Sequence, residues 1–405
     1  TGTEVNSQGN YLRTKTWNYT GSGTWTLGDH DLKFGADYAT NDIYNLYSAQ
    51  AWGVYTFWAG AADANGNHAL TNFQNGRWAT YNHRTEYSPG SFAADYKNSN
   101  LGLFIQDTWY VSPNLTLTLG VRGDRPDVSP EPRYNALADQ VFGYDNSQVF
   151  SGDFLVQPRF GFNYTFNSER PMQVRGGVGL FQGDAPQVWI GNSYANNGYN
   201  YAQLQATAYD PTLRFSPDGN NQPGSGSCNP YPSSRTGCQM SVNFTQKDFE
   251  LPSIWKANLA FDHELPWYGV VASAELIMTD VKNALYYRRL NLGPGFTGPD
   301  GRSLYWNPTK RGAAYATSDN QYGRDTRFGD VYLIDNTSKG KSQQFTASLT
   351  KPWSPGSDWS WTLGYTYTHA TEVGPLTSST ASSGYTYQYS FNSGEDISQT
   401  CLLYT

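Results

Sequence analysis

Five histidines are the residues of this chain best suited to acid–base or metal chemistry, and they are widely scattered. They are His30, His68, His83, His263 and His369. No H-E-x-x-H pattern occurs, and no cysteine stands at a spacing from a histidine that would suit zinc. No carboxylate pair or nucleophile with its base stands out either. We therefore expect ordinary turn, loop and wall histidines, no catalytic site, no metal and no cofactor.

One short segment resembles the start of a calcium-binding loop. It is Asp63-Ala64-Asn65-Gly66-Asn67. An acidic residue should follow at the twelfth position, and none does. We expect a polar turn here and no calcium site.

Aromatic residues are concentrated in two long polar segments, 45–97 and 183–250. The candidate ligand-binding residues there are Trp52, Tyr55, Phe57, Trp58, Trp189, Tyr194 and Tyr199. Rings accompanied by Asn and Gln suit capture of a sugar or peptide, because a ring offers an apolar face with little entropy to lose. The alternative is that the rings pack against one another and support the loop. The sequence leaves both interpretations open.

Two cysteines, Cys228 and Cys238, bracket the Pro- and Ser-rich segment CNPYPSSRTGC. In an exported protein this spacing predicts a disulfide that closes a small loop. The alternative is a pair of free thiols. Cys401 has no evident partner.

The elements that must position these residues are strands. Residues 115–122, LTLTLGVR, alternate apolar and polar side chains, as do 159–166, RFGFNYTF, and the run WSWTLGYTYT from Trp359. Period-two alternation is typical of a wall with one apolar face. About ten such strands are predicted, near 11–27, 31–44, 98–111, 115–126, 154–166, 172–182, 253–265, 270–287, 340–352 and 359–372.

The connections between these strands alternate in length. Short links rich in Gly, Pro and Asn occur near 28–30, 112–114, 167–171, 266–269 and 355–358, whereas 45–97, 128–151, 183–250 and 288–338 are long. Long structureless loops are uncommon in compact domains. Short periplasmic turns with long extracellular loops are typical of transmembrane barrels.

The polar faces of the predicted strands carry eight charged residues that bear on the orientation of the wall. They are Lys33, Asp37, Arg122, Asp124, Arg159, Arg175, Lys256 and Asp262. A Lys or Arg on the lipid face costs about 2–4 kcal/mol at the bilayer midplane, so this face is predicted to line the lumen.

The composition agrees with a barrel. Aromatic residues make up 16% of the 405 residues, whereas charged residues make up 15% and hydrophobic residues 38%. A wall in which every second residue is apolar, with Tyr and Trp at the lipid–water interfaces, has this balance. The sequence contains no apolar run of about 20 residues, so a helical membrane protein is excluded. The net charge of −7 gives no support to nucleic-acid binding.

The segment LGLFIQDTWYVSPNLTLTLGVRGD, residues 101–124, resembles the paired strands of TonB-dependent receptors, which carry Q-D-x-W, a short turn and L-T-L-x-x-G-x-R. Further similarity lies in residues 157–166, 175–198, 249–267 and 331–345. The match FELPSIWKANLAFDHELPW, residues 249–267, points to the Oar-like branch of this family. The resemblance covers residues 11–395.

This resemblance implies an all-β, antiparallel transmembrane barrel of about 22 strands with long extracellular loops. Residues 1–405 are then expected to form part of the barrel domain, with the signal peptide, the plug, the TonB box and the C-terminal strands outside the chain. An incomplete barrel with unpaired edges is expected. Lumenal Arg122, Arg159 and Arg175 would line a solute path or contact the plug, and the family favours the plug.

Two functions follow from this interpretation. The first is a receptor of the Gram-negative outer membrane whose extracellular loops capture an unknown ligand, and whose plug admits it when the TonB complex pulls on the missing N-terminal region. The second is a surface adhesion or structural protein that transports nothing. A passive porin is a third and weaker alternative.

Overall fold

The computed structural model describes residues 4–58, 62–86, 91–150, 153–184, 187–206, 209–224, 238–293, 295–305, 324–374, 378, 380–386 and 393–400. Its elements are the 3-10 helix η1 (Val5–Ser7), β1 (Asn10–Leu27), β2 (His30–Tyr47), β3 (Val54–Thr56), α1 (Ala69–Gln74), β4 (Thr80–Glu86), β5 (Ala93–Ser112), β6 (Leu115–Ser129), α2 (Ala136–Phe142), β7 (Leu155–Thr165), β8 (Met172–Gln182), α3 (Gln187–Ala195), β9 (Tyr201–Ala206), β10 (Cys238–Thr245), β11 (Ser253–Glu264), β12 (Val271–Arg289), β13 (Phe296–Thr297), β14 (Ser303–Leu304), β15 (Phe328–Thr337), β16 (Lys341–Lys351), β17 (Trp361–Glu372), α4 (Ala381–Thr386) and β18 (Ser398–Thr400).

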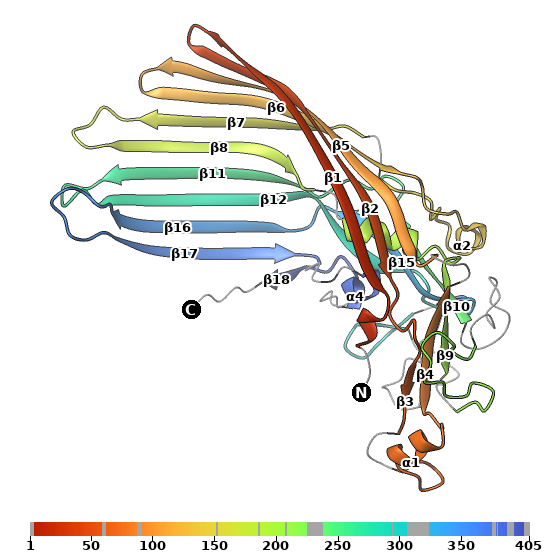
Figure 1. Ribbon diagram of the computed structural model, residues 1–405. Helices are drawn as coiled ribbons and strands as arrows, with labels where there is room; N and C mark the ends of the chain where they lie inside the picture. The colour runs from red at the N-terminus through yellow and green to blue at the C-terminus, as the bar shows by residue number, and fades with distance from the viewer. Residues whose placement is uncertain are drawn as a thin grey trace.

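Ten long strands form one curved wall (Figure 1). In order across the sheet they are β1, β2, β5, β6, β7, β8, β11, β12, β16 and β17, each antiparallel to the next. Each predicted segment corresponds to one of these strands. The largest boundary difference is at β5, which begins at Ala93 and not at residue 98.

The wall does not close into a ring within the described residues. Strand β1 pairs only with β2 at one edge, and β17 pairs with β16 and the short β18 at the other. The number of strands in a whole barrel stays a prediction. Among the described helices, none is long and apolar enough to cross a membrane.

Tight turns join the strands at one end of the wall. The β1–β2 hairpin has two connecting residues, and Gly28 stands at φ +57°. Glycine adopts this left-handed conformation without the steric penalty of a side chain. At the β5–β6 turn, Asn114 donates its side-chain amide to the backbone oxygen of Thr165 on β7 (2.6 Å). Neighbouring hairpins are thereby held in register.

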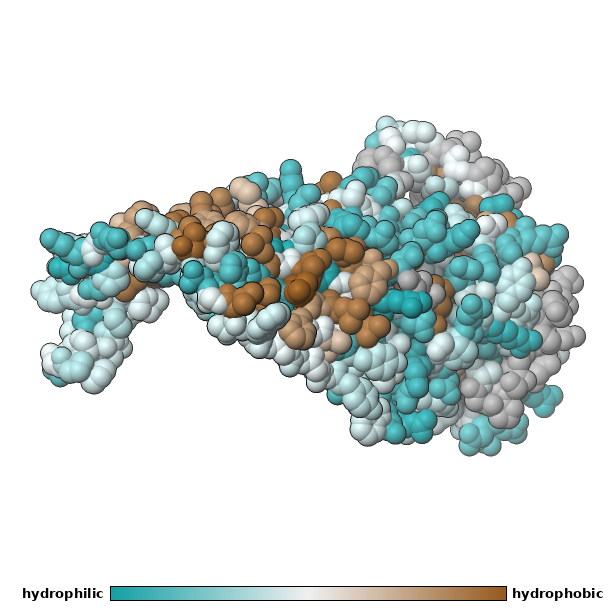
Figure 2. Space-filling model, turned by 90° about the horizontal axis from the view of Figure 1, so that it is seen from above, coloured by the Kyte–Doolittle hydropathy of each residue, from teal (hydrophilic) through white to brown (hydrophobic). Residues whose placement is uncertain are grey.

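The two faces of the wall differ in chemistry. Strand pairing places Phe34, Leu103, Ile105, Val121, Phe160, Val178 and Leu259 on one face, where they are exposed. Tyr19 and Tyr38 lie on this face toward the loop end, and Trp25 and Trp361 lie on it toward the turns. Figure 2 shows apolar side chains gathered over the sheet and hydrophilic residues around the loops. An apolar band flanked by aromatic residues is what a lipid-facing wall presents.

The long connections contain further strands, called the loop sheet here, whose pairing continues that of the wall. The outer end of β12 pairs with β15, and the sheet continues through β10, β9, β4 and β3. Strands from three separate connections therefore meet beyond the wall (Figure 1). The ten strands of the wall are antiparallel, as predicted, whereas β10 and β15 of the long connections pair in parallel.

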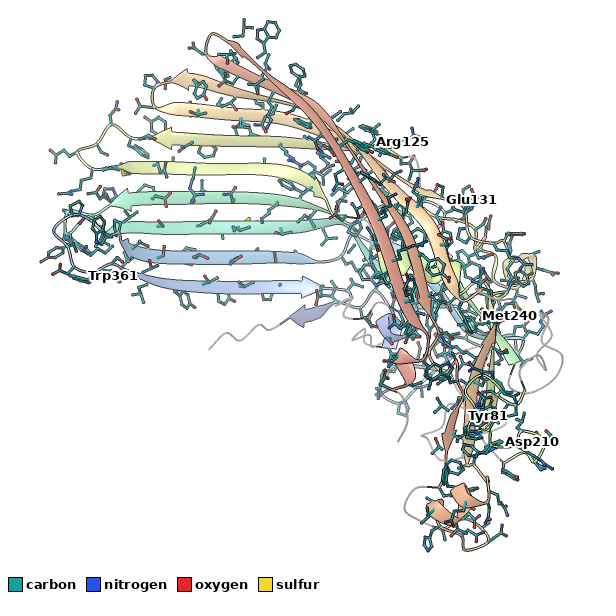
Figure 3. All side chains as sticks on the ribbon, viewed as in Figure 1. Tyr81, Arg125, Glu131, Asp210, Met240 and Trp361 are labelled. Carbon is teal, nitrogen blue, oxygen red and sulfur yellow. The ribbon has the colours of Figure 1, made fainter. Side chains whose placement is uncertain are left out.

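Two hydrophobic clusters hold this loop sheet together. Ala138 and Phe142 of α2 pack against Met240, Phe244 and Phe328 of β10 and β15. Farther out, Trp78 and Tyr81 are fully buried with Leu204. Figure 3 shows Met240 and Tyr81 in this outer part of the molecule and Trp361 at the opposite end of the wall. The buried apolar side chains explain why these polar-looking connections form strands and helices.

The difference between the two faces can be tested with one pair of substitutions. We expect Ile105→Lys, on the apolar face of β5, to lower the free energy of unfolding by about 2–4 kcal/mol, because lipid cannot solvate an ammonium group. Thr118→Lys, on the polar face of β6, should change it by about 0.5 kcal/mol or less. The measurement is a urea titration of the complete gene product refolded into lipid vesicles. Equal effects of the two substitutions would contradict the assignment of the faces.

Candidate functional site

The eight charged residues predicted to face the lumen share one face of the wall. Strand pairing places Lys33, Asp37, Arg122, Asp124, Arg159, Arg175, Lys256 and Asp262 opposite the apolar face. The structure brings five of them into two separate ionic groups. Lys33, Arg159 and Lys256 lie outside both groups, and the Arg159 guanidinium lies 4.7 Å from the centre of the Phe181 ring.

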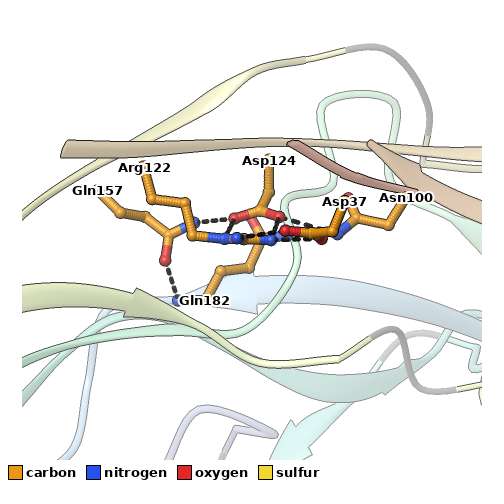
Figure 4. A network of polar contacts seen from close by, with 6 residues as sticks. All are labelled: Asp37, Asn100, Arg122, Asp124, Gln157 and Gln182. Carbon is orange, nitrogen blue, oxygen red and sulfur yellow. Dashed lines mark hydrogen bonds and ion pairs between the residues drawn. The ribbon is translucent and has the colours of Figure 1, made fainter. Parts of the chain in front are cut away.

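The first group is centred on Arg122 (Figure 4). Its Nη1 and Nη2 donate to both carboxylate oxygens of Asp37 (2.7 and 2.9 Å). Its Nε and Nη2 donate to both oxygens of Asp124 (2.7 Å each). One guanidinium therefore joins two carboxylates from β2 and β6, a geometry in which planar Arg gives stronger pairing than Lys.

Amide side chains complete the environment of Asp124, which is almost fully buried. Gln157 donates to its Oδ2 (2.5 Å) and Asn100 donates to its Oδ1 (2.9 Å). Gln157 in turn accepts a hydrogen bond from the Gln182 backbone (3.0 Å). The network thus crosses five strands of the wall, from β2 to β8. Buried charge of this kind is stable only when each group has partners.

A glycine makes this network possible. Arg122 and Asp37 lie on strands separated by β5, and Gly102 occupies the position on β5 between them. A Cβ atom at Gly102 would collide with the Arg122 guanidinium and with the Asp37 carboxylate. A glycine on the polar face of a strand, between two strands that carry charged residues, is therefore the sequence signal that could have indicated the pairing of Arg122 with Asp37.

The second group joins β8, β11 and β12. The Arg175 Nε donates to Asp262 (3.2 Å), and its Nη1 lies 3.9 Å from Glu275. Gln173 also donates to Asp262 (3.1 Å). The lumenal charges are thus largely paired with one another within the wall.

A polar hollow of about 500 Å³ lies where the loop end of the wall meets the loops. It is bounded by β1, β2, α3, β9, β10, β15 and α4. Six asparagines line it, together with three tyrosines and one residue of each charge. These are Asn6, Asn10, Asn45, Asn192, Asn196, Asn243, Tyr47, Tyr201, Tyr332, Arg84 and Asp330.

The hollow opens on the lumenal side of the wall. Asn10 and Leu12 of β1, and Asn45 of β2, share the face that carries Asp37. The helix α3 covers the same face of β5, where Gly191 approaches Ala94 and Tyr96. A further hollow, of about 550 Å³, is lined largely by apolar-face residues such as Ile105, Val121 and Phe160. Because that face meets lipid, the polar hollow is the better candidate for a ligand site.

The aromatic residues predicted to bind ligand lie in different places, and none lines the polar hollow. Tyr55 stacks on Tyr81 (ring centres 4.4 Å apart), and Phe57 packs edge-on against Phe73 and Phe215. Burial raises the pKa of the Tyr55 hydroxyl. These rings form the outer cluster around Trp78. Trp52 is largely exposed and Trp58 is half-buried.

The three aromatic residues of the second segment lie closer to the wall. Tyr194 is buried and stacks on Tyr96 (4.7 Å), and its hydroxyl donates to the Pro130 backbone. Trp189 donates its indole N–H to the Ser378 backbone (3.1 Å). The Arg133 guanidinium lies 4.5 Å from the centre of the Tyr199 ring. These contacts are structural, and ligand binding by the same rings stays a prediction.

The structure also shows where the predicted polar turn and one of the histidines lie. Asp63 accepts hydrogen bonds from the backbone of Asn65 and Asn67 (2.9 and 2.8 Å), which is a polar turn. His30 pairs with Asp107 (2.8 Å) beside a turn. Cys228 lies outside the described residues, so the disulfide with Cys238 stays a prediction. In the described part of the chain, no group of three or more His, Cys, Asp or Glu side chains is placed to hold a metal ion.

Comparison with known protein families identifies the family of this chain. The family model described as "Outer membrane beta barrel domain" matches residues 1–402. No curated protein sequence matches the chain.

Solved structures with partial similarity include three outer-membrane proteins. The ferric enterobactin receptor of Pseudomonas aeruginosa shares 12% identity (TM-score 0.44), with 89% of this chain and 39% of that chain covered. The outer membrane transporter YddB of Escherichia coli shares 12% (TM-score 0.43), with 89% and 34% covered. The copper transporter OprC shares 12% (TM-score 0.38), with 89% and 42% covered. This chain therefore spans less than half the length of each.

The role of Gly102 can be tested by adding one methyl group. We expect Gly102→Ala to separate Arg122 from Asp37 and to lower the free energy of unfolding by about 1–3 kcal/mol, because a charged hydrogen-bonded pair is broken. Gly120→Ala is the matched control on the same face, since its Cβ would meet Gln106 at an ordinary 3.4 Å. Urea titrations of both variants provide the measurement. Equal stability of the two variants would show that the network does not depend on the glycine.

The outer loop sheet is expected to lose stability in acid through His83. Burial lowers the pKa of His83, and a hydrogen bond with the Gln50 backbone opposes this only in part. As the pH falls below the ordinary value of about 6.5, the unfolded segment takes up a proton that the folded segment resists, so the folded segment loses stability. Hydrogen exchange of β3, β4 and β9 should therefore be faster at about pH 5.5 than at about pH 7.5, after correction for the intrinsic rate.

Two variants identify the responsible group. His83→Phe keeps a buried ring next to Tyr81 and should remove the pH dependence. His68→Phe, at an exposed position, should leave it unchanged. Persistence of the pH dependence in His83→Phe would show that another group titrates.

Proposed function

This chain belongs to the outer membrane β-barrel domain family, and on that basis we propose that it forms the wall and loops of a TonB-dependent receptor of the Oar-like branch. The receptor captures a ligand outside the cell and admits it through the lumen by energy-coupled uptake. Location in the outer membrane follows from the family. The ligand step, the uptake step and the TonB partner belong to the proposal.

One observation carries the proposal: the polar hollow lies at the loop end of the wall and shares the face that carries the Arg122 network. A ligand bound between α3, β10 and β15 would thus stand at the entrance of the lumen. Binding sites in barrel proteins commonly occupy the mouth of the barrel. A protein that only contacts other surfaces has no need for a polar hollow on its lumenal side.

The paired charges of the wall fit a plug as the neighbour on this face. Arg122 pairs with Asp124 of its own strand and with Asp37 of β2, two strands away, and Arg175 pairs with Asp262 of the neighbouring β11. A wall whose charges are already paired can lie against a second, polar protein surface without large desolvation penalties. This supports the family-based expectation that the lumenal face contacts a plug.

The TonB partnership has a direct test, and its first part needs no knowledge of the ligand. We expect the complete gene product, purified in detergent, to bind the isolated C-terminal domain of TonB in calorimetry, with a porin as the negative control. We also expect surface-bound ligand to enter cells that have TonB and to stay at the surface of cells that lack it. Absence of TonB binding, with equal surface binding in both strains, would favour the adhesion function.

A further inference from the structure

The polar hollow has a composition that selects for a particular ligand chemistry. Its asparagines are held in place by other groups of the hollow. Asn196 accepts a hydrogen bond from the Tyr201 hydroxyl (2.6 Å) and donates to the Asn192 backbone (3.1 Å). The backbone N–H of Asn243 donates to the Asn196 backbone (2.8 Å). The site is therefore preorganised, which reduces the entropy lost on binding.

The two charged groups of the hollow already have partners. The Arg84 guanidinium lies 4.8 Å from the centre of the Tyr201 ring, and its Nε donates to Gln203 (3.3 Å). Asp330 accepts a hydrogen bond from Tyr332 (3.3 Å) and lies 3.7 Å from Arg289. The residues that line the hollow thus present no surplus of either charge. A strongly anionic chelate would meet a single Arg beside an Asp, and a bare cation a single Asp, so neither finds the concentration of opposite charge that it requires.

Asparagine amides match ligands that carry hydroxyl groups. Each amide offers a donor and an acceptor side by side, and each sugar hydroxyl also donates and accepts. Tyrosine rings add flat apolar area for the C–H face of a sugar ring. The hollow, at about 500 Å³, falls in the usual size range for small-molecule sites and would hold a few sugar rings.

The strands around the hollow argue against capture of an extended peptide. Peptides commonly bind by adding a strand to an open sheet edge. Strands β2, β9, β10 and β15 each have a paired neighbour on both sides. Their backbones are already used, so recognition at these four strands must come mainly from side chains. Strand β1 also lines the hollow and is an edge strand within the described residues.

We propose that this hollow binds a neutral oligosaccharide. The proposal rests on the proposed receptor function and names its ligand class. The asparagines of β1, β2, α3 and β10 hydrogen-bond the hydroxyl groups, and the tyrosines contact the sugar rings. The loops containing α3 and β10 thus contribute to specificity, and the outer aromatic cluster supports them.

The test uses the complete gene product in detergent and two kinds of probe. A glycan array with neutral and acidic oligosaccharides is screened first, and the best neutral glycan is then titrated by calorimetry. An acidic oligogalacturonide and a Gly-Ser hexapeptide serve as the competing classes. We expect a neutral glycan to bind and the competing classes to bind at least about tenfold more weakly.

Two matched pairs of variants locate the site. Ser241→Phe fills the hollow from β10, and Ser348→Phe places the same ring on the polar face of β16, far from the hollow. Asn45→Leu removes an amide from the hollow, and Asn18→Leu does so elsewhere on the same face. We expect the first member of each pair to weaken binding by about tenfold or more and its control to leave it unchanged. A heat-modifiable band on electrophoresis confirms that each variant is folded.

The outcomes separate the ligand class from the receptor function. If no neutral glycan binds, or if the acidic glycan or the peptide binds more tightly, the ligand class is wrong, although TonB binding could still support the receptor. If both Ser241→Phe and Asn45→Leu fold and bind normally, the location is wrong. If the glycan binds at the hollow but TonB does not bind, the site stands and the energy-coupled uptake fails.

Discussion

The requirement that every backbone N–H and C=O group find a partner in a medium without water governs this structure. Lipid offers no hydrogen bonds, so a chain that crosses it as separate strands must pair each strand with its neighbours. Pairing fixes side chains at a period of two, and lipid then demands apolar residues at alternate positions. The polar face follows as a consequence, since the remaining positions are free to carry Asp37, Arg122 and Arg175. The Arg122 network exists because that face is shielded from lipid.

The same requirement explains how the loops become ordered. Strand β12 continues past the end of β16, and its outer residues need a new partner, which β15 provides between Ala284 and Arg289. Gly340, at φ +126°, lies just before β16, where the partner of β12 changes. From β15 the pairing continues to β10, β9, β4 and β3. The wall strand β12 is therefore joined to strands from three separate connections. The polar hollow lies at this junction of the two sheets.

Much of the wall could be predicted from the sequence, because its signal is local. Alternation in LTLTLGVR and RFGFNYTF identifies a strand without knowledge of its neighbours, and every predicted wall segment corresponds to one. The polar network could not be predicted, since Asp37 meets Arg122 only through the registers of β2, β5 and β6. The parallel pairing of β10 with β15 joins residues nearly 90 positions apart in the sequence, and a local pattern of residues cannot predict such a pairing. The many aromatic residues drew attention to the long loops, but they did not indicate the asparagines of the hollow. Those asparagines form a candidate site only because folding brings them together.

In the proposed receptor, the arrangement of charge along the lumenal face predicts where selectivity is exerted. In the wall, the Arg122 guanidinium is held by the carboxylates of Asp37 and Asp124, so its hydrogen bonds are occupied, and Arg175 is held by Asp262 of the neighbouring strand. At the loop end, amides and hydroxyls line a hollow without surplus charge. The wall, braced by its two ionic groups, would then provide rigidity, and the preorganised polar groups of the mouth would provide recognition. Changes in ligand preference among related chains should therefore be concentrated in α3, β10 and the loop ends of β1 and β2, whereas changes in the wall should alter stability.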